Sequence, residues 1–479
     1  MMPSFSSIGS SDAMDSKAAL ANEVPWQAYM TAKLITEREL ELIKGYDKQS
    51  EEIQNALLEQ DGPAYVEAFM TVLRNTTKEQ VVQYVLALLN AMVTSDPSRA
   101  RLFHVQSDAH KGRVAEPYTV FERHLKRTDW FTQEMGARLL TAVLASRPEK
   151  ERSVFASGQH VPRLTGEGSS SDPGVDLSVA ERAVLMFMDW LTSQLRRPTN
   201  ATKSIPTAVF CLASLLRERG VRKLFHRAGG ISLLAPILRS GVQAQSLNIQ
   251  LLYEATLCVW LLSYMPDCAK AIKDCAIPRS LVGVVRANVK EKVTRVGLYS
   301  LKNMLTSDAD VTQEVVESGL PKLVQIRMLQ NWEDEDIPSV LEWLDDHLKT
   351  VIEVLSNYEK YKQEVLSGRL DWGPMHTEEQ FWRQNIHKLE EKDFHVLRVL
   401  LRLLEVSREV QTLAVGCYDL GQFVTYHPHG RHIVNDLRGK EVVMELMRHS
   451  DTEVQKNALL CVQKIMLSKD KLDFLSAMA

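Results

Sequence analysis

The chain has 479 residues, of which 45% are hydrophobic and 25% are charged, and its net charge is −4 at pH 7. This balance is ordinary for a soluble protein, and the slight acidity argues against a dedicated nucleic-acid binder, which is normally basic. No uncharged apolar run reaches the ~18 residues of a membrane span, and the candidate stretch 255–266 is interrupted by polar side chains.

We expect no secretory signal at the N-terminal end. Residues 1–20 are rich in Ser and lack both a basic stretch and an apolar core, so we predict a disordered tail. Residues 23–46 are predicted to form an amphipathic cap, since the end repeat of a helical array must present one face to water. Six cysteines are too few for a disulfide scaffold in a chain of this length, which favours a cytosolic protein.

A helical pattern recurs along the chain every 44 residues. Ile205, Ile249 and Val293 mark this interval, and Val410 and Val454 repeat it further on. The positions open apolar stretches at helical spacing. A period of roughly 40–47 residues built from helices is typical of armadillo and HEAT arrays. We therefore predict an all-α fold, an armadillo/HEAT-like α-solenoid in two domains, whose long surface binds other proteins.

The predicted N-terminal domain covers residues 21–355. Strongly apolar helices are expected at 78–93 and 130–145. Residues 159–177 are rich in Gly, Ser, Pro and Asp without periodicity, so we predict a mobile loop there. The acidic run 333–336 is interpreted as a solvated loop, and a docking site for a basic partner is the alternative.

The repeat pattern breaks between residues 356 and 385. A flexible linker should be polar and small, whereas this stretch is aromatic, with Tyr361, Trp372, Phe381 and Trp382. We predict that 356–385 is a linker that packs against one or both flanking domains and limits how far they swing. A second, shorter helical-repeat domain is predicted to follow at 386–479.

The sequence contains no recognised catalytic motif. It lacks a G-x-x-x-x-G-K-[ST] phosphate loop, H-E-x-x-H and G-x-S-x-G. His427, His429 and His432 lie close enough in sequence to ligate zinc, but Pro428 and Gly430 mark a turn between helices. We interpret this stretch as a basic turn, and we predict no catalytic, cofactor or metal site.

A more specific signal comes from the residues of the linker and its surroundings. They include Tyr358, Tyr361, Glu364, Val365, Ser367, Gly368, Leu370, Trp372, Pro374, His376, Glu379, Phe381, Trp382 and Asn385. The same pattern extends to residues outside the linker, namely Val24, Trp26, Tyr29, the stretch 78–86, Asp419, Gly421, Tyr426, Pro428, Gly430 and the stretch 457–464. This pattern closely resembles the H-subunit family of the eukaryotic vacuolar-type proton-translocating ATPases (V-ATPases). The resemblance covers nearly the whole chain and is weakest at 159–177.

The resemblance implies a non-catalytic regulatory subunit of the soluble sector of that pump. Its N-terminal domain is expected to bind a peripheral stalk of two coiled-coil subunits. Its C-terminal domain is expected to contact the cytosolic domain of the membrane-bound stator subunit. After the sectors separate, the same domain is expected to hold the catalytic head and rotor and to suppress ATP hydrolysis. The implied location is the cytosolic face of vacuolar and other endomembranes, reached through the complex without membrane insertion.

Two groups of residues are singled out as candidate sites within this scheme. The linker group consists of Trp372, Pro374, His376, Phe381 and Trp382. An interdomain switch and plain domain packing are equally open roles for its aromatic members. The second group is the inter-helix loop Ser407-Arg408-Glu409, which is expected to project from the C-terminal domain as a protein contact. The alternative function is a generic HEAT/armadillo scaffold or trafficking adaptor, which would share the 44-residue period but not the aromatic linker.

Overall fold

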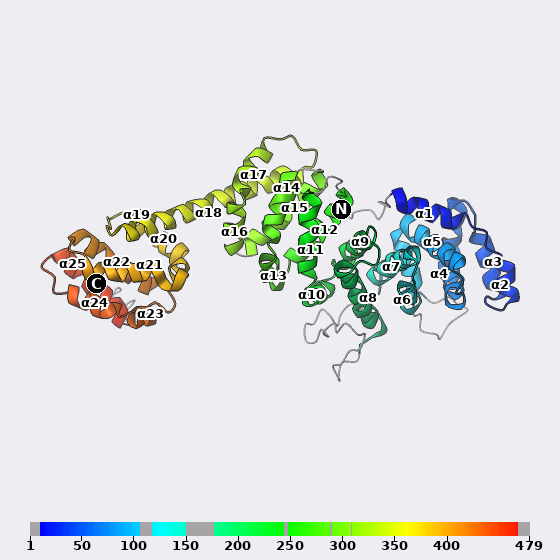
Figure 1. The fold of residues 1–479 in the computed structure, drawn as a ribbon, viewed down its shortest axis with the longest axis horizontal. Coiled ribbons are helices and arrows are strands. Elements are labelled where there is room, and N and C mark those ends of the chain that lie inside the picture. The colour runs from blue at the N-terminus through cyan, green and yellow to red at the C-terminus, as the bar shows by residue number, and fades with distance from the viewer. Residues whose placement is uncertain are drawn as a thin grey trace. The chain divides into compact units, whose positions relative to one another are not determined.

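The computed structural model describes residues 10–105, 117–149, 177–243, 248–287, 290–307 and 309–467. Within these ranges the regular structure is helical and no strand occurs, as Figure 1 shows. The predicted all-α fold is therefore confirmed. Apart from Leu177, the predicted mobile loop 159–177 lies outside the described residues. No described helix is long and apolar enough to cross a bilayer.

The chain divides into two compact units, residues 1–341 and 342–479. The division falls inside the long helix α18 (Asp336–Ser367) rather than at the predicted boundary after 355. The reason is that the later turns of α18 pack into the second unit, where Tyr358, Tyr361 and Val365 are buried.

The first unit is an array of helices connected by short turns. Its helices are α1 (Ser10–Leu20), α2 (Trp26–Thr31), α3 (Glu37–Tyr46), α4 (Glu51–Asn75), α5 (Glu79–Ser95), η1 (Pro97–His104), α6 (Tyr118–Leu125), α7 (Trp130–Ala145), α8 (Val179–Arg196), α9 (Ser204–Leu215), α10 (Arg219–Arg227), α11 (Gly230–Gln243), α12 (Ile249–Ser263), η4 (Pro266–Cys268), α13 (Ala269–Asp274), α14 (Ile277–Ala287), α15 (Glu291–Ser307), α16 (Ala309–Glu317) and α17 (Leu320–Met328).

One helix of each repeat packs on its counterpart in the next repeat. In this way α5, α7, α9, α12 and α15 contact one another in succession and lie side by side in Figure 1. The 44-residue period places Ile205, Ile249 and Val293 at or near the starts of the last three. A unit that cannot bury its own apolar face is stabilised by such stacking, and this confirms the α-solenoid.

The turns between helices repeat as well. The Arg196 Nη2 donates to the carbonyl of Ala228 at 2.6 Å, and the Arg286 Nη2 donates to that of Ser318 at 2.7 Å. The residue after each carbonyl is a glycine with positive φ, 70° at Gly229 and 81° at Gly319. Glycine is the residue that takes this conformation without a steric penalty after a helix end. The arginine satisfies a carbonyl that the helix itself leaves free.

The predicted disordered tail is wrong for residues 10–20. They form α1, which packs on α5, and Ala19 is buried. Asp15 of this helix pairs with Lys203 at 2.5 Å. The sequence of α1 has little amphipathic pattern, so helical periodicity does not predict it. It is stabilised by contacts with residues that are distant in sequence.

The acidic run 333–336 is partly used inside the first unit. Arg295 pairs with Asp334 at 2.9 Å, and Glu291 accepts the backbone N–H groups of Glu333 and Asp334 at 3.2 and 3.0 Å. These contacts shape the turn that leads into α18. Glu333, Glu335 and Asp336 are also exposed to solvent, as predicted for a solvated loop.

The second unit is built around α22 (Val410–Tyr426), which packs on α25 (Thr452–Met466) and on α21 (Glu391–Val406). Its remaining elements are α19 (Pro374–Thr377), α20 (Glu379–Asn385), η5 (Ile386–Glu390), α23 (Gly430–Asp436) and α24 (Gly439–Leu446). Cys417 and Cys461, 44 residues apart, are buried on α22 and α25. Burial raises the pKa of the Cys417 thiol to about 12, so this side chain behaves as a small core residue.

Candidate functional site

The segment predicted as a linker, 356–385, is part of the core of the second unit. Tyr361, Phe381 and Trp382 are buried together, with the Tyr361 ring centroid 5.3 Å from that of Phe381 and 5.6 Å from that of Trp382. The Tyr361–Trp382 pair is edge-to-face, an arrangement that adds to the free energy gained by burying large rings. The sequence predicts that the segment packs against one or both flanking domains, and these three residues are buried within the core of the second unit.

The backbone turns sharply to bring this segment onto α22. Helix α18 ends at Ser367, and Gly368 follows with a φ of 82°. The buried Leu370 then donates its backbone N–H to the Thr412 Oγ1 at 3.2 Å, which anchors the returning chain to the first turn of α22. Pro374 lies at the start of α19, a position where the missing N–H has no cost.

His376 forms the polar centre of the segment. Its Nδ1 lies 2.9 and 2.8 Å from the two carboxylate oxygens of Asp419, and its Nε2 lies 3.3 Å from the Glu364 Oε1. The Tyr361 hydroxyl donates to Asp419 at 3.2 Å. The side chains of His376 and Asp419 are both fully buried, whereas Glu364 keeps 21% of its side-chain surface exposed. A charged pair this deep is stabilised only when hydrogen bonds satisfy it.

The pKa values of this pair reflect the competition between burial and pairing. Burial disfavours the imidazolium, but the hydrogen bond and charge of Asp419, reinforced by Glu364, outweigh it and raise the pKa of His376. Burial raises the pKa of Asp419 to about 6, although the bonds from His376 and Tyr361 act in the opposite direction. Between about pH 6 and the raised pKa of His376, the stable arrangement is therefore an ionised Asp419 beside a protonated His376.

The other predicted linker residues lie nearer the surface. Trp372 is half-buried, with its indole N–H donating to the Glu453 Oε1 at 3.0 Å and its ring edge-on to Tyr418 at 5.3 Å. Pro374 is exposed. The five residues chosen from the sequence thus separate into a buried group, His376, Phe381 and Trp382, and a peripheral pair.

The loop Ser407-Arg408-Glu409 connects α21 to α22, in agreement with its interpretation as an inter-helix loop. Arg408 and Glu409 are exposed. The loop lies beside the returning segment, because Glu409 pairs with Arg369 at 3.8 Å and Thr412 holds Leu370. The structure therefore brings this loop beside the start of the returning segment, which carries the linker group a few residues further on.

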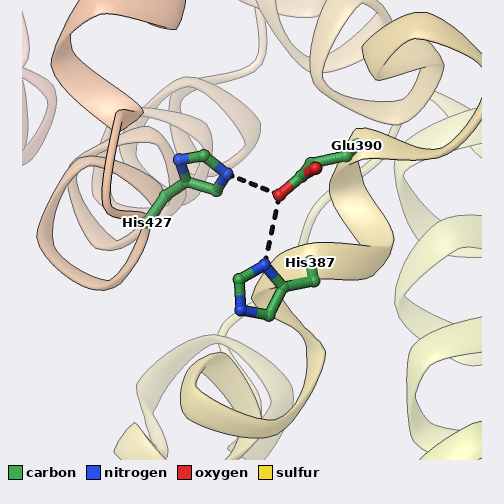
Figure 2. Close-up of side chains that lie close together, drawn as sticks. All are labelled: His387, Glu390 and His427. Carbon is green, nitrogen blue, oxygen red and sulfur yellow. Dashed lines mark hydrogen bonds and ion pairs between the residues drawn. The ribbon is translucent and has the colours of Figure 1, made fainter. Parts of the chain in front are cut away.

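The histidine turn makes different contacts from those that the sequence indicated. His427 Nε2 lies 2.8 Å from the Glu390 Oε1, and His387 Nδ1 lies 3.1 Å from the same oxygen, as Figure 2 shows. Neither His429 nor His432 takes part in this group. Sequence reasoning missed His387 and Glu390 because they precede His427 by about 40 residues and come from η5.

The donor atoms of His387, Glu390 and His427 lie within 4.8 Å of one another, so the group invites comparison with a metal centre. The second nitrogen of His427 decides against it. His427 Nδ1 accepts the backbone N–H of His429 at 3.1 Å, so the proton of the neutral ring is on Nε2 and is donated to Glu390. A metal would need the lone pair of that Nε2, and metal-bound imidazoles normally donate from the other nitrogen.

This group is therefore a hydrogen-bonded clamp between η5 and the end of α22. Hydrogen bonds from His427 and His387 lower the pKa of Glu390 and keep it ionised. The histidine turn thus includes a carboxylate from η5, and the absence of a metal site stays a prediction.

Comparison with known proteins gives matches over nearly the whole chain. Two family profiles, both described as the V-ATPase H subunit, match residues 13–348 and 354–469. The chain is 42% identical over 462 residues to a probable V-type proton ATPase H subunit of Oryza sativa subsp. japonica, with 96% of this chain and 98% of the relative covered. It is 30% identical to the V-type proton ATPase H subunit of Dictyostelium discoideum, with 94% of each covered.

A third relative is the V-type proton ATPase H subunit of Drosophila melanogaster, which is 30% identical over 93% of this chain and 87% of its own length. The two profiles meet between 348 and 354, close to the division inside α18. Family profiles and relatives thus agree along nearly the whole length of the sequence. The chain belongs to the H-subunit family of the V-ATPases.

Proposed function

We propose that the chain is a non-catalytic regulatory and stator subunit of the soluble sector of the vacuolar proton pump. It bridges the peripheral stalk to the membrane sector and is needed for coupled, ATP-driven proton transport. When the sectors separate, it inhibits ATP hydrolysis by the detached catalytic sector. The observation that carries the proposal is the match to a V-type proton ATPase H subunit over 96% of the chain at 42% identity.

The architecture suits this role for a physical reason. A stator must resist torque, and several modest interfaces on one body hold more firmly than any of them alone. A stacked helical array supplies such a body, since its core grows lengthwise and leaves a long surface for partners. In this proposal the first unit binds the peripheral-stalk subunits. The second unit contacts the cytosolic domain of the membrane-bound stator subunit, or the catalytic head and rotor after disassembly.

The loop Ser407-Arg408-Glu409 is our candidate for one of these contacts. Val406 and Val410 flank it with 56% and 38% of their surfaces exposed, and Arg369 lies beside it. Exposed apolar side chains surrounded by charged ones are a common composition for a protein–protein contact. Such a contact needs no catalytic group on this chain.

The inhibition is tested by adding the full-length chain to detached catalytic sector that lacks this subunit. We expect the ATPase rate to fall at saturating chain, and Arg408→Glu to weaken the inhibition at least about tenfold in the concentration required, as for loss of a central contact. Arg402→Glu, an exposed arginine on α21 that pairs with Glu405, is the matched control. An unchanged ATPase rate at saturation would reject the inhibitory role.

The stator role has a separate test. The chain should restore ATP-driven acidification to vacuolar membranes depleted of it, and an affinity-tagged chain should recover pump subunits from cytosol and from membranes. Recovery of other partners without any pump subunit would favour the alternative, a generic scaffold or trafficking adaptor. The same fractions show whether the chain reaches the cytosolic face of endomembranes through the complex.

A further inference from the structure

A single buried histidine holds the returning segment between two helices. Residues 368–379 pass from the end of α18 to the start of α20, and their one buried ionisable side chain is His376. It reaches Asp419 on α22 with Nδ1 and Glu364 on α18 with Nε2. A change in the charge of this side chain would therefore weaken the contact that joins segment 368–379 to α18 and α22.

The groups that face His376 are few and are mostly acceptors. Glu364 and Tyr361 come from α18. The ring centroid of Tyr361 lies 5.6 Å from that of the imidazole. From α22 comes Asp419, and from α20 comes the indole N–H of Trp382, which donates to the His376 backbone carbonyl at 2.7 Å. Within the described part of the chain, no Lys or Arg pairs with Asp419 or Glu364.

Protonation therefore decides the charge balance of this pocket. With a proton, the imidazolium donates from both nitrogens to two carboxylates that arrive from opposite sides. Without it, the neutral ring has one donor for two acceptors, so Asp419 or Glu364 loses one hydrogen bond and both lose the neighbouring positive charge. Asp419 then keeps only the Tyr361 hydroxyl, and Glu364 keeps the Asp371 N–H at 2.8 Å. Two carboxylates in one largely buried site without a cation between them are costly.

We propose that the proton on His376 is a built-in latch, which holds residues 368–379 against α18 and α22 and loosens them when it is lost. The effect extends to the loop 407–409, because Leu370 is anchored to Thr412 and Arg369 is paired with Glu409. A rise in pH thus alters the surface around this loop without any ligand. The inference concerns the isolated chain and stands or falls independently of the proposed function.

The sign of the pH effect follows from the raised pKa of His376. The pKa of His376 is raised by its carboxylates, so its stabilising contribution is complete below about pH 6.5, the ordinary value for histidine, and is lost as the pH rises through the folded-state value. The pKa of Asp419 is raised to about 6, so its burial penalty grows only between about pH 4 and 6 and is nearly constant above that range. The loosening toward alkaline pH therefore comes from His376.

The latch is tested by hydrogen–deuterium exchange of the full-length chain at pH 6.5 and 8.5, with rates corrected for the intrinsic effect of pH. Protection of peptides within 368–379 should fall at least about threefold more than that of the α25 peptides, a modest local opening. In His376→Gln the segment should be poorly protected at both pH values. His395→Gln, an exposed histidine on α21, should behave like the unmodified chain.

Two outcomes would overturn the proposal: an unmodified chain with no extra loss of protection at pH 8.5, or a His376→Gln chain that keeps the full pH response. If His376→Gln does not fold, the unmodified chain still decides the first point. Glu364→Gln then decides the second, since this side chain is partly exposed and tolerates the change. With one carboxylate removed, the loosening should begin at lower pH than in the unmodified chain, and an unshifted midpoint would contradict the latch.

Discussion

The two units each bury a histidine completely, and the two side chains have opposite surroundings. His124 on α6 has no hydrogen-bond partner for either ring nitrogen among the described residues, and burial, together with Arg123 and Arg127, lowers its pKa to about 4. His376 in the second unit lies between two carboxylates that raise its pKa. The comparison teaches that burial alone favours the neutral ring, and that only placed carboxylates reverse this preference.

The same contrast holds for the two cores. The first unit stacks equivalent helices, so that α5, α7, α9, α12 and α15 contact one another in succession. The second unit completes its core with the aperiodic segment 356–385, whose aromatic and ionic contacts occur once. Loss of one contact should therefore be felt more sharply in the second unit, and the following predictions test this difference.

The largest expected effect is that of Trp382→Ala. The ring is 1% exposed and its indole N–H is bonded to the His376 carbonyl, so truncation should cost about 3–5 kcal/mol of unfolding free energy in the second unit. Trp372→Ala is the matched control, because this ring is half-buried and should cost roughly 1 kcal/mol. Calorimetry with the transition of each unit resolved checks both values. Equal losses for the two tryptophans would show that 356–385 is a surface linker after all.

Asp419→Ala should cost about 3 kcal/mol or more, because it leaves His376 buried without its closest partner. The loss should be largest near pH 6.5, where the paired form is most stabilised, and smaller above pH 8.5. Denaturant titrations at the two pH values measure it. A loss that is the same at both would mean that Asp419 contributes by packing rather than by charge.

His124→Leu should remove an acid-sensitive step from the first unit. The depressed pKa means that the unfolded chain takes up a proton at this residue below pH 6.5, so stability is lost as the pH falls from about 6.5 to 4. The shift corresponds to roughly 3 kcal/mol. Thermal unfolding of the first unit between pH 7 and 4.5 should show a shallower acid slope in the variant. An identical slope would assign the acid sensitivity to other groups.

The smallest expected effect is that of Glu390→Gln, which removes the carboxylate from the His387–Glu390–His427 clamp. Glu390 is 45% exposed on its side chain, and such pairs contribute about 0.5 kcal/mol. Addition of Zn²⁺ should raise the melting temperature of the unmodified chain by no more than it raises that of the variant. A zinc-dependent rise confined to the unmodified chain would contradict the hydrogen-bond assignment made from His427 Nδ1.

The sequence by itself determined the helical repeat. Apolar residues at 3.6-residue spacing dictate which face of each helix is buried, and the 44-residue interval dictates that equivalent faces stack. Ile205, Ile249 and Val293, and Cys417 with Cys461, therefore fell where the period placed them. The aromatic stretch 356–385 also pointed to the family before its contacts were known.

Only the tertiary structure decided what that stretch does and where the units divide. His376 meets Asp419 across 43 residues, and His427 meets Glu390 across 37, distances at which no local pattern specifies a partner. Helix α1 is stabilised by contacts with α5 and Lys203, and the composition of α1 does not predict these contacts. Periodicity encodes which face of a helix is apolar, whereas single polar contacts depend on which distant chain segments packing brings within about 3 Å.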